Sequence, residues 1–412
     1  MGGEASRTGS AGGSARRDMR GITFSKQFPN PAEPLRGTFV AEQVAATGDR
    51  VGWSIIAPAP WVPRWASKLL QRPVVPRSSE FDGVGVVHPV YPVLPRRLLY
   101  LTVAPVMAAS SRRAFRTALA TAGARFVHAH AIYPSGSAAR RLCAETGLPL
   151  VLSVHGSDLY TNLVRPAWAR EVRRTIAAAS VIVCVSTTLA RDVVSMAGAD
   201  ASRVVVVPNT YDAARFTCQE RTRADVLRLV SVGRLAPEKG FDMLIEAVGI
   251  ALTRGLECQL TVVGAGPEGD RLRGLIEHLR LEGRVRLAGA LDGDRLLAEL
   301  RDADVFVSSS HREGFGVAIL EALATGLPVV ATQSGGPVDL IGPEDGLLVP
   351  PDDAEALGRA IDSIAGDLDR FDGASIARRA FERFSPEVVG AQLVEVYERV
   401  VGTADANRQV RS

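Results

Sequence analysis

Cysteine is scarce in this sequence, and its spacing carries no metal motif. The four cysteines among 412 residues lie at positions 143, 184, 218 and 258, and none forms a Cys-x-x-Cys pair. Cysteine-ligated zinc sites usually contain Cys-x-x-Cys pairs and disulfide-rich domains contain many cysteines, so the sequence indicates neither. We expect four small, buried core residues in a chain that works in a reducing cytoplasm.

Long hydrophobic runs are missing as well. The longest, such as LLYLTVAPVMAA at 98–109, are shorter than the roughly 20 residues that a membrane-spanning helix needs. Residues 1–18 are rich in Gly, Ser and Arg and lack the apolar core of a secretory signal, so they predict a disordered tail. These features favour a cytoplasmic protein.

A dinucleotide-binding turn is absent from the place where it would carry chemistry. In a nucleotide-sugar epimerase or dehydrogenase, Gly-x-Gly-x-x-Gly follows the first strand. Residues 21–30 contain no such motif, and GAGPEG at 264–269 comes too late in the chain. We therefore expect no bound cofactor.

A metal-binding Asp-x-Asp pair at a strand end is missing too. Asp292 and Asp294 read as the first turn of a helix, and Asp302 and Asp304 precede a strand instead of following one. The sequence therefore predicts no metal site.

What the sequence does contain is an alternation of short apolar runs and helical periodicity, in two consecutive sets. Val- and Ile-rich strands that alternate with helices are typical of parallel sheets covered on both faces. Two such sets predict an α/β chain with two Rossmann-like, doubly wound domains that face a cleft. The expected strands are 21–25, 51–57, 125–130, 149–155, 181–186 and 203–208, then 227–234, 259–264, 284–289, 304–309, 327–332 and 345–350.

The domain boundary is expected where this periodicity lapses, at 209–226. An N-terminal domain would span 19–208 and a C-terminal domain 227–385. The last helix, 386–402, has no strand after it. Other helices are expected at 38–47, 136–146, 187–197, 240–253, 268–281, 293–302, 317–325, 353–365 and 371–382.

Charge is distributed unevenly along the chain. Residues 1–205 carry 25 Lys and Arg against 12 Asp and Glu, a net charge of +13, and the remainder carries −10. A basic first domain predicts contact with something anionic, either the inner face of a membrane or a phosphorylated acceptor. Arginines beside the apolar segments WASKLL and LLYLTVAPVMAA favour the membrane; they are Arg64, Arg72, Arg77, Arg96, Arg97, Arg112, Arg113 and Arg116.

Polar residues gather directly after the expected strands, which is where open α/β sheets bind ligands. In GRLAPEKG (233–240), Arg234 follows a strand and Lys239 precedes the next helix. Two cations that converge at a strand end and a helix start can bind a diphosphate and stabilise charge on a leaving phosphate. The alternative is a pair of solvated loop side chains.

The stretch SSSHREGFGVAILEALATG (308–326) places two carboxylates around a glycine turn. Gly316 opens a helix, so backbone amides can approach a phosphate there. Glu313 precedes the turn and can face a sugar attached to that phosphate. Glu321 lies further inside the helix, at a depth suited to the hydroxyls of a ribose.

The first half contributes candidates of its own. His155, in HGSD (155–158), would point into the cleft as a neutral imidazole that bonds a sugar hydroxyl; a structural strand-end histidine is the alternative. Gly37 and Thr38 open a helix and would contact a phosphate or the acceptor, or simply cap that helix. His128 reads as core. Further cleft residues are predicted at His130, Asp158, Asn209, Gly264 and Gly266.

Together these motifs resemble the retaining glycosyltransferases of the GT-B fold, in the large group called family 4. The resemblance covers about residues 20–402. In the second half it rests on GRLAPEKG, VVGAGPEGDRL, LAGAL, SSSHREGFGVAILEALATGLPVVAT and GGPVDLIGPEDGLLVPPDD, and in the first on GTFVAEQVAA, HGSD and VVPNTYD. One departure is Asp339, where the family usually has Glu.

The resemblance implies a role for each matching residue. Arg234 and Lys239 would bind the nucleotide diphosphate, Glu313 the donor sugar and Glu321 the ribose hydroxyls. His155 would contact the transferred sugar from the first, acceptor-side domain, and the loop of Gly37 would close near the diphosphate. Amides for the sugar and phosphate would come from Gly314, Phe315, Gly316 and Val317.

The implied reaction moves a sugar from a nucleotide-diphosphate sugar to an acceptor hydroxyl with retention of configuration and without metal. We expect envelope polysaccharide or glycolipid synthesis, with a lipid-linked acceptor and no nucleic-acid partner. A soluble secondary-metabolite acceptor is the alternative. A catalytically silent, membrane-docked scaffold of the same fold is the non-enzymatic one. The base and the sugar of the donor stay open.

Overall fold

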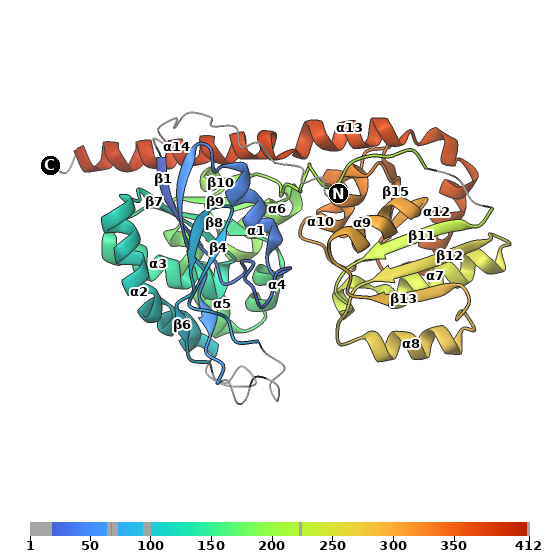
Figure 1. Ribbon diagram of the computed structural model, residues 1–412, viewed down its shortest axis with the longest axis horizontal. Helices are drawn as coiled ribbons and strands as arrows, with labels where there is room; N and C mark the ends of the chain where they lie inside the picture. The colour runs from blue at the N-terminus through green and yellow to red at the C-terminus, as the bar shows by residue number, and fades with distance from the viewer. Residues whose placement is uncertain (1–18, 64–66, 68–72, 94–99, 222–224, 410–412) are drawn as a thin grey trace, which may run out of the picture.

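The computed structural model describes residues 19–63, 67, 73–93, 100–221 and 225–409. The expected disordered tail, 1–18, lies outside these residues. Figure 1 shows two α/β bodies side by side, with the last helices of the chain running along both.

The N-terminal domain is built on an eight-stranded sheet in the order β10-β9-β8-β7-β1-β2-β5-β4. All neighbouring strands are parallel except β4 and β5. The strand order reverses between β1 and β7, which opens a crevice at their carboxyl ends. The strands are β1 Met19–Phe24, β2 Val51–Ile56, β4 Ser78–Phe81, β5 Val84–Val87, β7 Phe126–His130, β8 Leu150–Val154, β9 Val181–Cys184 and β10 Val204–Val206.

Both faces of this sheet are buried, which explains its continuous apolar strands. In β8, Leu150 and Leu152 belong to the core under α2, α3, α5 and α6, whereas Val151 belongs to the core under α1 and α14. The helices of this domain are α1 Thr38–Ala46, α2 Val103–Ala122, α3 Ser137–Thr146, α4 Ser157–Leu163, α5 Pro166–Ala178 and α6 Thr187–Ala197, with a π-turn at Ile132–Gly136 and 3-10 turns at Tyr100–Thr102 and Ala201–Arg203.

The C-terminal domain has a six-stranded, fully parallel sheet in the order β13-β12-β11-β14-β15-β16. Its order reverses between β11 and β14, so a second crevice opens there and faces the first. The strands are β11 Leu227–Val232, β12 Cys258–Val263, β13 Val285–Gly289, β14 Val305–Ser308, β15 Val329–Thr332 and β16 Gly346–Val349. The helices are α7 Phe241–Thr253, α8 Gly269–His278, α9 Gly293–Asp302, α10 Val317–Ala324, α11 Pro337–Leu340, α12 Ala354–Gly366 and α13 Gly373–Phe384, with 3-10 turns at Pro237–Lys239 and Leu368–Arg370.

Helix α14, Pro386–Gln409, returns from the C-terminal domain to the N-terminal one (Figure 1). Its Tyr397 is fully buried against Trp53 and Phe126, and its hydroxyl lies 2.9 Å from His128 Nδ1. Gly390 allows close approach, because an added Cβ would lie 2.2 Å from the carbonyl oxygen of Ala46. The helix continues well past the expected end at residue 402.

The expected strands lie within two residues of their predicted positions. The strands that the periodicity did not predict all lie between β2 and β7. There, Asp82 and Gly83 both have positive φ, 46° and 73°, and close a tight turn between β4 and β5. Two short strands, β3 Ala59–Pro60 and β6 Val90–Tyr91, pair separately, and α2 follows. The described part of LLYLTVAPVMAA mostly packs into the core through Val103, Ala104, Met107 and Ala108.

That burial bears on the membrane hypothesis. Arg112 forms a two-pronged ion pair with Glu145, at 2.9 and 2.7 Å. Arg64, Arg72, Arg96 and Arg97 lie outside the described residues. Among the residues that the structure does describe, no helix is both long and apolar enough to cross a bilayer.

All four cysteines are free thiols. Cys143, Cys184 and Cys258 are buried as expected, whereas Cys218, in the segment between the domains, is only partly buried.

Candidate active site

A cavity of about 310 Å³ opens between the two domains, at the carboxyl ends of both sheets. His155, Ser157 and Phe39 reach it from the N-terminal domain. The C-terminal domain supplies the loop after β11, with Arg234 and Lys239, and the segment from β14 into α10, which is residues 308–319 without His311, Arg312 and Gly314. The reversal of strand order in each sheet therefore brings these distant segments together.

Lys239 and Glu313, both of the C-terminal domain, form an ion pair on the wall of this cavity. Ser310 also donates to the same carboxylate oxygen of Glu313 from 3.3 Å. Lys239 is held at the end of a 3-10 turn by Gly240, whose φ is 59° and whose added Cβ would lie 2.3 Å from the carbonyl oxygen of Ser309. The ammonium of Lys239 could bind a diphosphate, and the carboxylate of Glu313 could accept hydrogen bonds from sugar hydroxyls. The pair therefore suits a ligand that carries both groups.

Arg234 lines the same cavity but is largely exposed, and it pairs with Glu238 at 2.6 Å. Its position suits the outer side of a diphosphate, and a bound anion would compete with Glu238 for it.

The start of α10 faces the cavity with free amides. Gly316 is the N-cap with φ 102°, a conformation that glycine adopts without strain, and because it has no side chain it leaves the first amides of the helix uncapped. Gly314 packs directly on the N-terminal domain, because an added Cβ would lie 2.1 Å from the carbonyl oxygen of His155. Phe315 turns its ring into the core against Phe384, so only its backbone is available to a ligand.

Glu321 lies in a neighbouring cavity of about 240 Å³ that shares Phe39 and Val317 with the first. Burial raises the pKa of Glu321 to about 8, and the nearby Glu42 carboxyl adds to the rise. Thr38 lines this second cavity. Two adjoining cavities, one with cations and amides and one with a carboxylate deep in a helix, match a diphosphate joined to a nucleoside.

His155 forms the floor on the N-terminal side, and His130 lies behind it. The His155 ring lies 4.6 Å from that of Phe39 and stacks on His130 at 5.7 Å, and no described residue bonds either nitrogen of either ring. Burial lowers the pKa of His155 to about 4, so its imidazole is neutral at physiological pH. His130 is 1% exposed and lies behind His155, not on the cavity wall. His128 is a core residue, as expected, bonded to Tyr397 and Ser153.

Several predicted cleft residues shape the walls instead of lining them. Asp158 lines neither cavity, and its carboxylate accepts from the amides of Ile132 (2.6 Å) and His155 (3.2 Å). Gly264 and Gly266 also line neither cavity. A Cβ added at Gly264 would lie 1.8 Å from the carbonyl oxygen of Gly233, and one added at Gly266 would lie 2.2 Å from that of Leu235. They therefore allow the loop after β12 to pack on the loop that carries Arg234.

Asn209 and Gly37 are intermediate cases. Asn209 lines the first cavity, where its Oδ1 accepts from Gln43 at 3.1 Å. Gly37, with φ 67°, lies against the backbone of Gln27, at 2.5 Å from an added Cβ. Gly37 lets its own loop approach the loop of Gln27 closely, and Gln27 itself lines the cavity.

Two acidic residues of the second cavity escaped sequence reasoning. Glu42 lies one helical turn after Thr38, so it faces the same way, and burial with nearby Asp212 raises its pKa to about 7. Asp212 lies in the segment between the domains, near Arg215. The i, i+4 spacing from Thr38 was the available signal for Glu42; for Asp212 there was none beyond its motif.

Of the two Asp-x-Asp pairs, three aspartates bind arginines and the fourth, Asp292, lines the second cavity. Asp302 and Asp304 both pair with Arg228, at 2.9 and 2.8 Å, at the amino-end edge of the sheet. Asp294 pairs with Arg215 at 3.3 Å. Within the described part of the chain, no cluster of three or more His, Cys, Asp or Glu residues could hold a metal ion.

Comparison with known families now adds to this geometry. The model of the family described as "Glycosyl transferases group 1" matches residues 218–370, and that of "Glycosyltransferase Family 4" matches residues 38–215. The chain belongs to this family of glycosyltransferases.

Curated relatives agree. The D-inositol 3-phosphate glycosyltransferase of Kineococcus radiotolerans is 32% identical over 68% of this chain and 73% of its own length. A Bacillus subtilis protein named as a teichuronic acid biosynthesis glycosyltransferase, TuaC, is 29% identical over 83% of this chain and 88% of its own. The lipopolysaccharide core biosynthesis glycosyltransferase LpsE of Rhizobium meliloti is 40% identical over 45% of this chain and 52% of its own.

Solved structures establish the GT-B fold. Sucrose-phosphate synthase from Thermosynechococcus elongatus superposes with a TM-score of 0.75 at 21% identity, over 93% of this chain and 99% of that one. Anabaena HepE in complex with UDP-glucose superposes with a TM-score of 0.70 at 20% identity, over 92% and 100%.

In this glycosyltransferase the domains also touch beside the cleft. Asp339 accepts from both the amide and the hydroxyl of Thr187, each at 2.6 Å, and the guanidinium of Arg312 lies 4.3 Å from the ring centre of Tyr160. Asp339 therefore makes a short interdomain contact.

Proposed function

We propose that this glycosyltransferase moves a sugar from a nucleotide-diphosphate sugar to an acceptor hydroxyl, with retention and without a metal ion. The observation that carries the proposal is the Lys239–Glu313 pair, which lines one cavity together with the open start of α10 and the neutral His155. The cavity offers the Lys239 cation and the amides of α10 to a diphosphate, and it offers the Glu313 carboxylate to the attached sugar.

The cations supply the stabilisation that the reaction needs most. When the bond between sugar and diphosphate breaks, negative charge grows on the phosphate oxygens. Lys239 and the amides around Gly316 face that charge, and Arg234 adds to them from the rim. They stand in place before the reaction, so little reorganisation is needed.

Retention is supported by what the cavity offers as a base. Among the described residues that line it, Glu313 is the one carboxylate, and it is bound to Lys239. In a substitution on one face of the sugar, the leaving phosphate oxygen takes the acceptor proton itself. Neutral His155 can bond a sugar hydroxyl without placing a positive charge near the oxocarbenium-like carbon.

For the acceptor, we propose a lipid-linked saccharide of envelope polysaccharide or glycolipid synthesis, at the inner membrane face. The names of TuaC and LpsE point to envelope polymers, and the first 205 residues carry a net charge of +13. A soluble acceptor is the alternative, and a flotation assay with anionic vesicles would distinguish it from a lipid-linked one.

The test begins with a thermal-shift screen of sugar nucleotides, followed by transfer assays with and without EDTA. Lys239→Ala should lower turnover by roughly 10²–10³-fold, whereas Arg280→Gln, an exposed control on the opposite side of the domain, should not. The anomeric configuration of the product, read from its proton couplings, tests retention. A parental rate in Lys239→Ala would refute the site, and absence of transfer with every donor that binds would favour a silent scaffold.

A further inference from the structure

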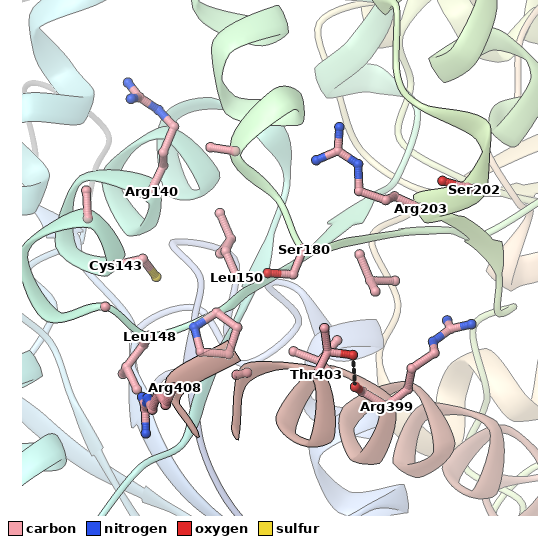
Figure 2. Close-up of a pocket in the computed structure, with 17 residues that line it drawn as sticks. Arg140, Cys143, Leu148, Leu150, Ser180, Ser202, Arg203, Arg399, Thr403 and Arg408 are labelled. Carbon is pink, nitrogen blue, oxygen red and sulfur yellow. Dashed lines mark hydrogen bonds between the residues drawn. The ribbon is translucent and has the colours of Figure 1, made fainter. Parts of the chain in front are cut away.

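A second cavity, of about 620 Å³, lies in the N-terminal domain at the edge opposite the cleft (Figure 2). Its lining comes from α3, from the residues at the starts of β8 and β9 and before β10, and from the end of α14, residues 399–408. Because a five-residue strand is roughly 17 Å long, the donor cleft at the other strand ends is well separated from it.

The charge of this cavity is entirely positive. Arg140, Arg203, Arg399 and Arg408 line it, and its described lining contains no Asp or Glu. In Figure 2, Arg203 and Arg399 lie on the right, above and below, Arg140 and Arg408 lie on the left, above and below, and Ser180 lies near the middle. Arg140 pairs with Glu171 at 2.9 Å and Arg203 with Asp200 at 3.5 Å, so the charge that no described residue balances is that of Arg399 and Arg408, and an anion that enters lowers the energy of the site.

These arginines differ in how they are held. Arg203 Nη1 donates to the carbonyl oxygens of Ala177 and Ala179, at 3.1 and 3.2 Å, which fixes it at the end of α5. Arg140 is fixed by Glu171 at 2.9 Å. These two are placed before any ligand arrives.

Arg399 and Arg408 are the available pair. No described residue forms an ion pair with either guanidinium, and both side chains are exposed. Since guanidinium groups bind phosphate in a two-pronged geometry, they suit a ligand that carries more than one phosphate oxygen.

The floor of the cavity is apolar. Leu148, Leu150, Val181 and Val400 form it, all buried, and the hydroxyls of exposed Ser180, Ser202 and Thr403 ring it. A bare inorganic ion would leave that floor uncovered, whereas a phosphate ester would cover it with its carbon skeleton. The volume, twice that of the donor cavity, has room for such a molecule.

We propose that this cavity is a second anion site, which takes a phosphate-bearing ligand and is independent of the donor cleft. The ligand is either a soluble phosphate ester or a phospholipid headgroup, which present the same chemistry. Next to the cavity, Arg170, Arg173 and Arg174 of α5 line a shallow groove that extends the basic surface. A bound anion would join the end of α14 to the sheet edge of the N-terminal domain.

The test compares Arg399→Gln/Arg408→Gln with a charge-matched control, Arg280→Gln/Arg295→Gln, whose two exposed arginines belong to the C-terminal domain, lie outside the cavity and form no ion pair with any described residue. The soluble probe is inorganic tripolyphosphate in calorimetry, with the donor cleft saturated by the best sugar nucleotide of the screen. The membrane probe is flotation with phosphatidylglycerol vesicles against phosphatidylcholine vesicles. All chains are full length, and thermal unfolding checks that they fold.

We expect the parent and the control to bind at least one probe, and the cavity variant to bind it at least tenfold more weakly. Selective loss of tripolyphosphate binding identifies a soluble ligand, and selective loss of flotation identifies a headgroup. Equal binding by the cavity variant and the control, or no binding of either probe by the parent, overturns the proposal. None of these outcomes depends on glycosyl transfer.

Discussion

The carboxyl of Glu321 makes donor binding depend on pH in a way that the structure defines. Burial raises its pKa to about 8; Glu42 across the cavity and Asp212 raise it, and Arg215 opposes the rise. If ribose hydroxyls bind the ionised form, the donor must first find a carboxylate that has lost its proton. We therefore expect the affinity for a sugar nucleotide to increase from pH 6 to pH 8.

The size of the effect follows from the pKa. With a pKa of about 8, the ionised fraction of Glu321 grows from about one hundredth at pH 6 to about one half at pH 8. Affinity should rise about fiftyfold over that interval, which is roughly 2.3 kcal/mol. Glu42→Gln removes the largest charge effect on Glu321, so the midpoint of the transition should move to lower pH and binding near pH 7 should tighten.

Calorimetry with a sugar nucleotide measures this cleanly, because its diphosphate is esterified at both ends and does not titrate in this range. Glu321→Gln is the matched variant, since it keeps the shape and cannot ionise. Its affinity should be nearly flat with pH and lower than that of the parent at pH 9. A parental affinity that does not change between pH 6 and pH 9, or a slope that survives in Glu321→Gln, would refute the reasoning.

Three further predictions concern stability. The folded pKa values of Glu42 and Glu321, about 7 and about 8, exceed the ordinary 4.5. The contribution of these two carboxyls to stability is therefore complete below about pH 4.5 and is lost as pH rises through 8. At pH 8.5, Glu42→Gln/Glu321→Gln should unfold at a higher temperature than the parent, and an unchanged or lower unfolding temperature contradicts this. Tyr397→Phe leaves buried His128 without its 2.9 Å partner. Denaturant titration should therefore show that the free energy of unfolding falls by about 1–3 kcal/mol, and a fall of less than about 0.5 kcal/mol speaks against the bond. Gly390→Ala places a methyl group 2.2 Å from the Ala46 oxygen, whereas Gly402→Ala on the same helix meets nothing within 4 Å; the first should lower the melting temperature and the second should raise it slightly through helix propensity, and equal effects would count against close packing of α14 on α1.

How much of the site could be read in advance depends on the kind of residue. Arg234, Lys239, Glu313 and the α10 turn follow strands, and parallel strands always end at one edge, so their gathering was predictable from order along the chain. Asp158 and Gly264 follow strands as well, yet one is bound by backbone amides and the other meets a neighbouring loop. Position after a strand identifies the rim but does not tell a lining side chain from a supporting one.

The sequence by itself determined the two Rossmann-like sheets, because apolar runs and helical periodicity act over a few residues and leave a local signature. It could not determine that Gly314 lies on His155, or that Glu42 faces Glu321, since these contacts depend on how two domains meet. Nor could it reveal the arginine-lined cavity, because Arg140, Arg203, Arg399 and Arg408 are far apart in the chain and only the return of α14 brings them together. Local physics sets the elements, and the packing of whole elements decides which charges share a space.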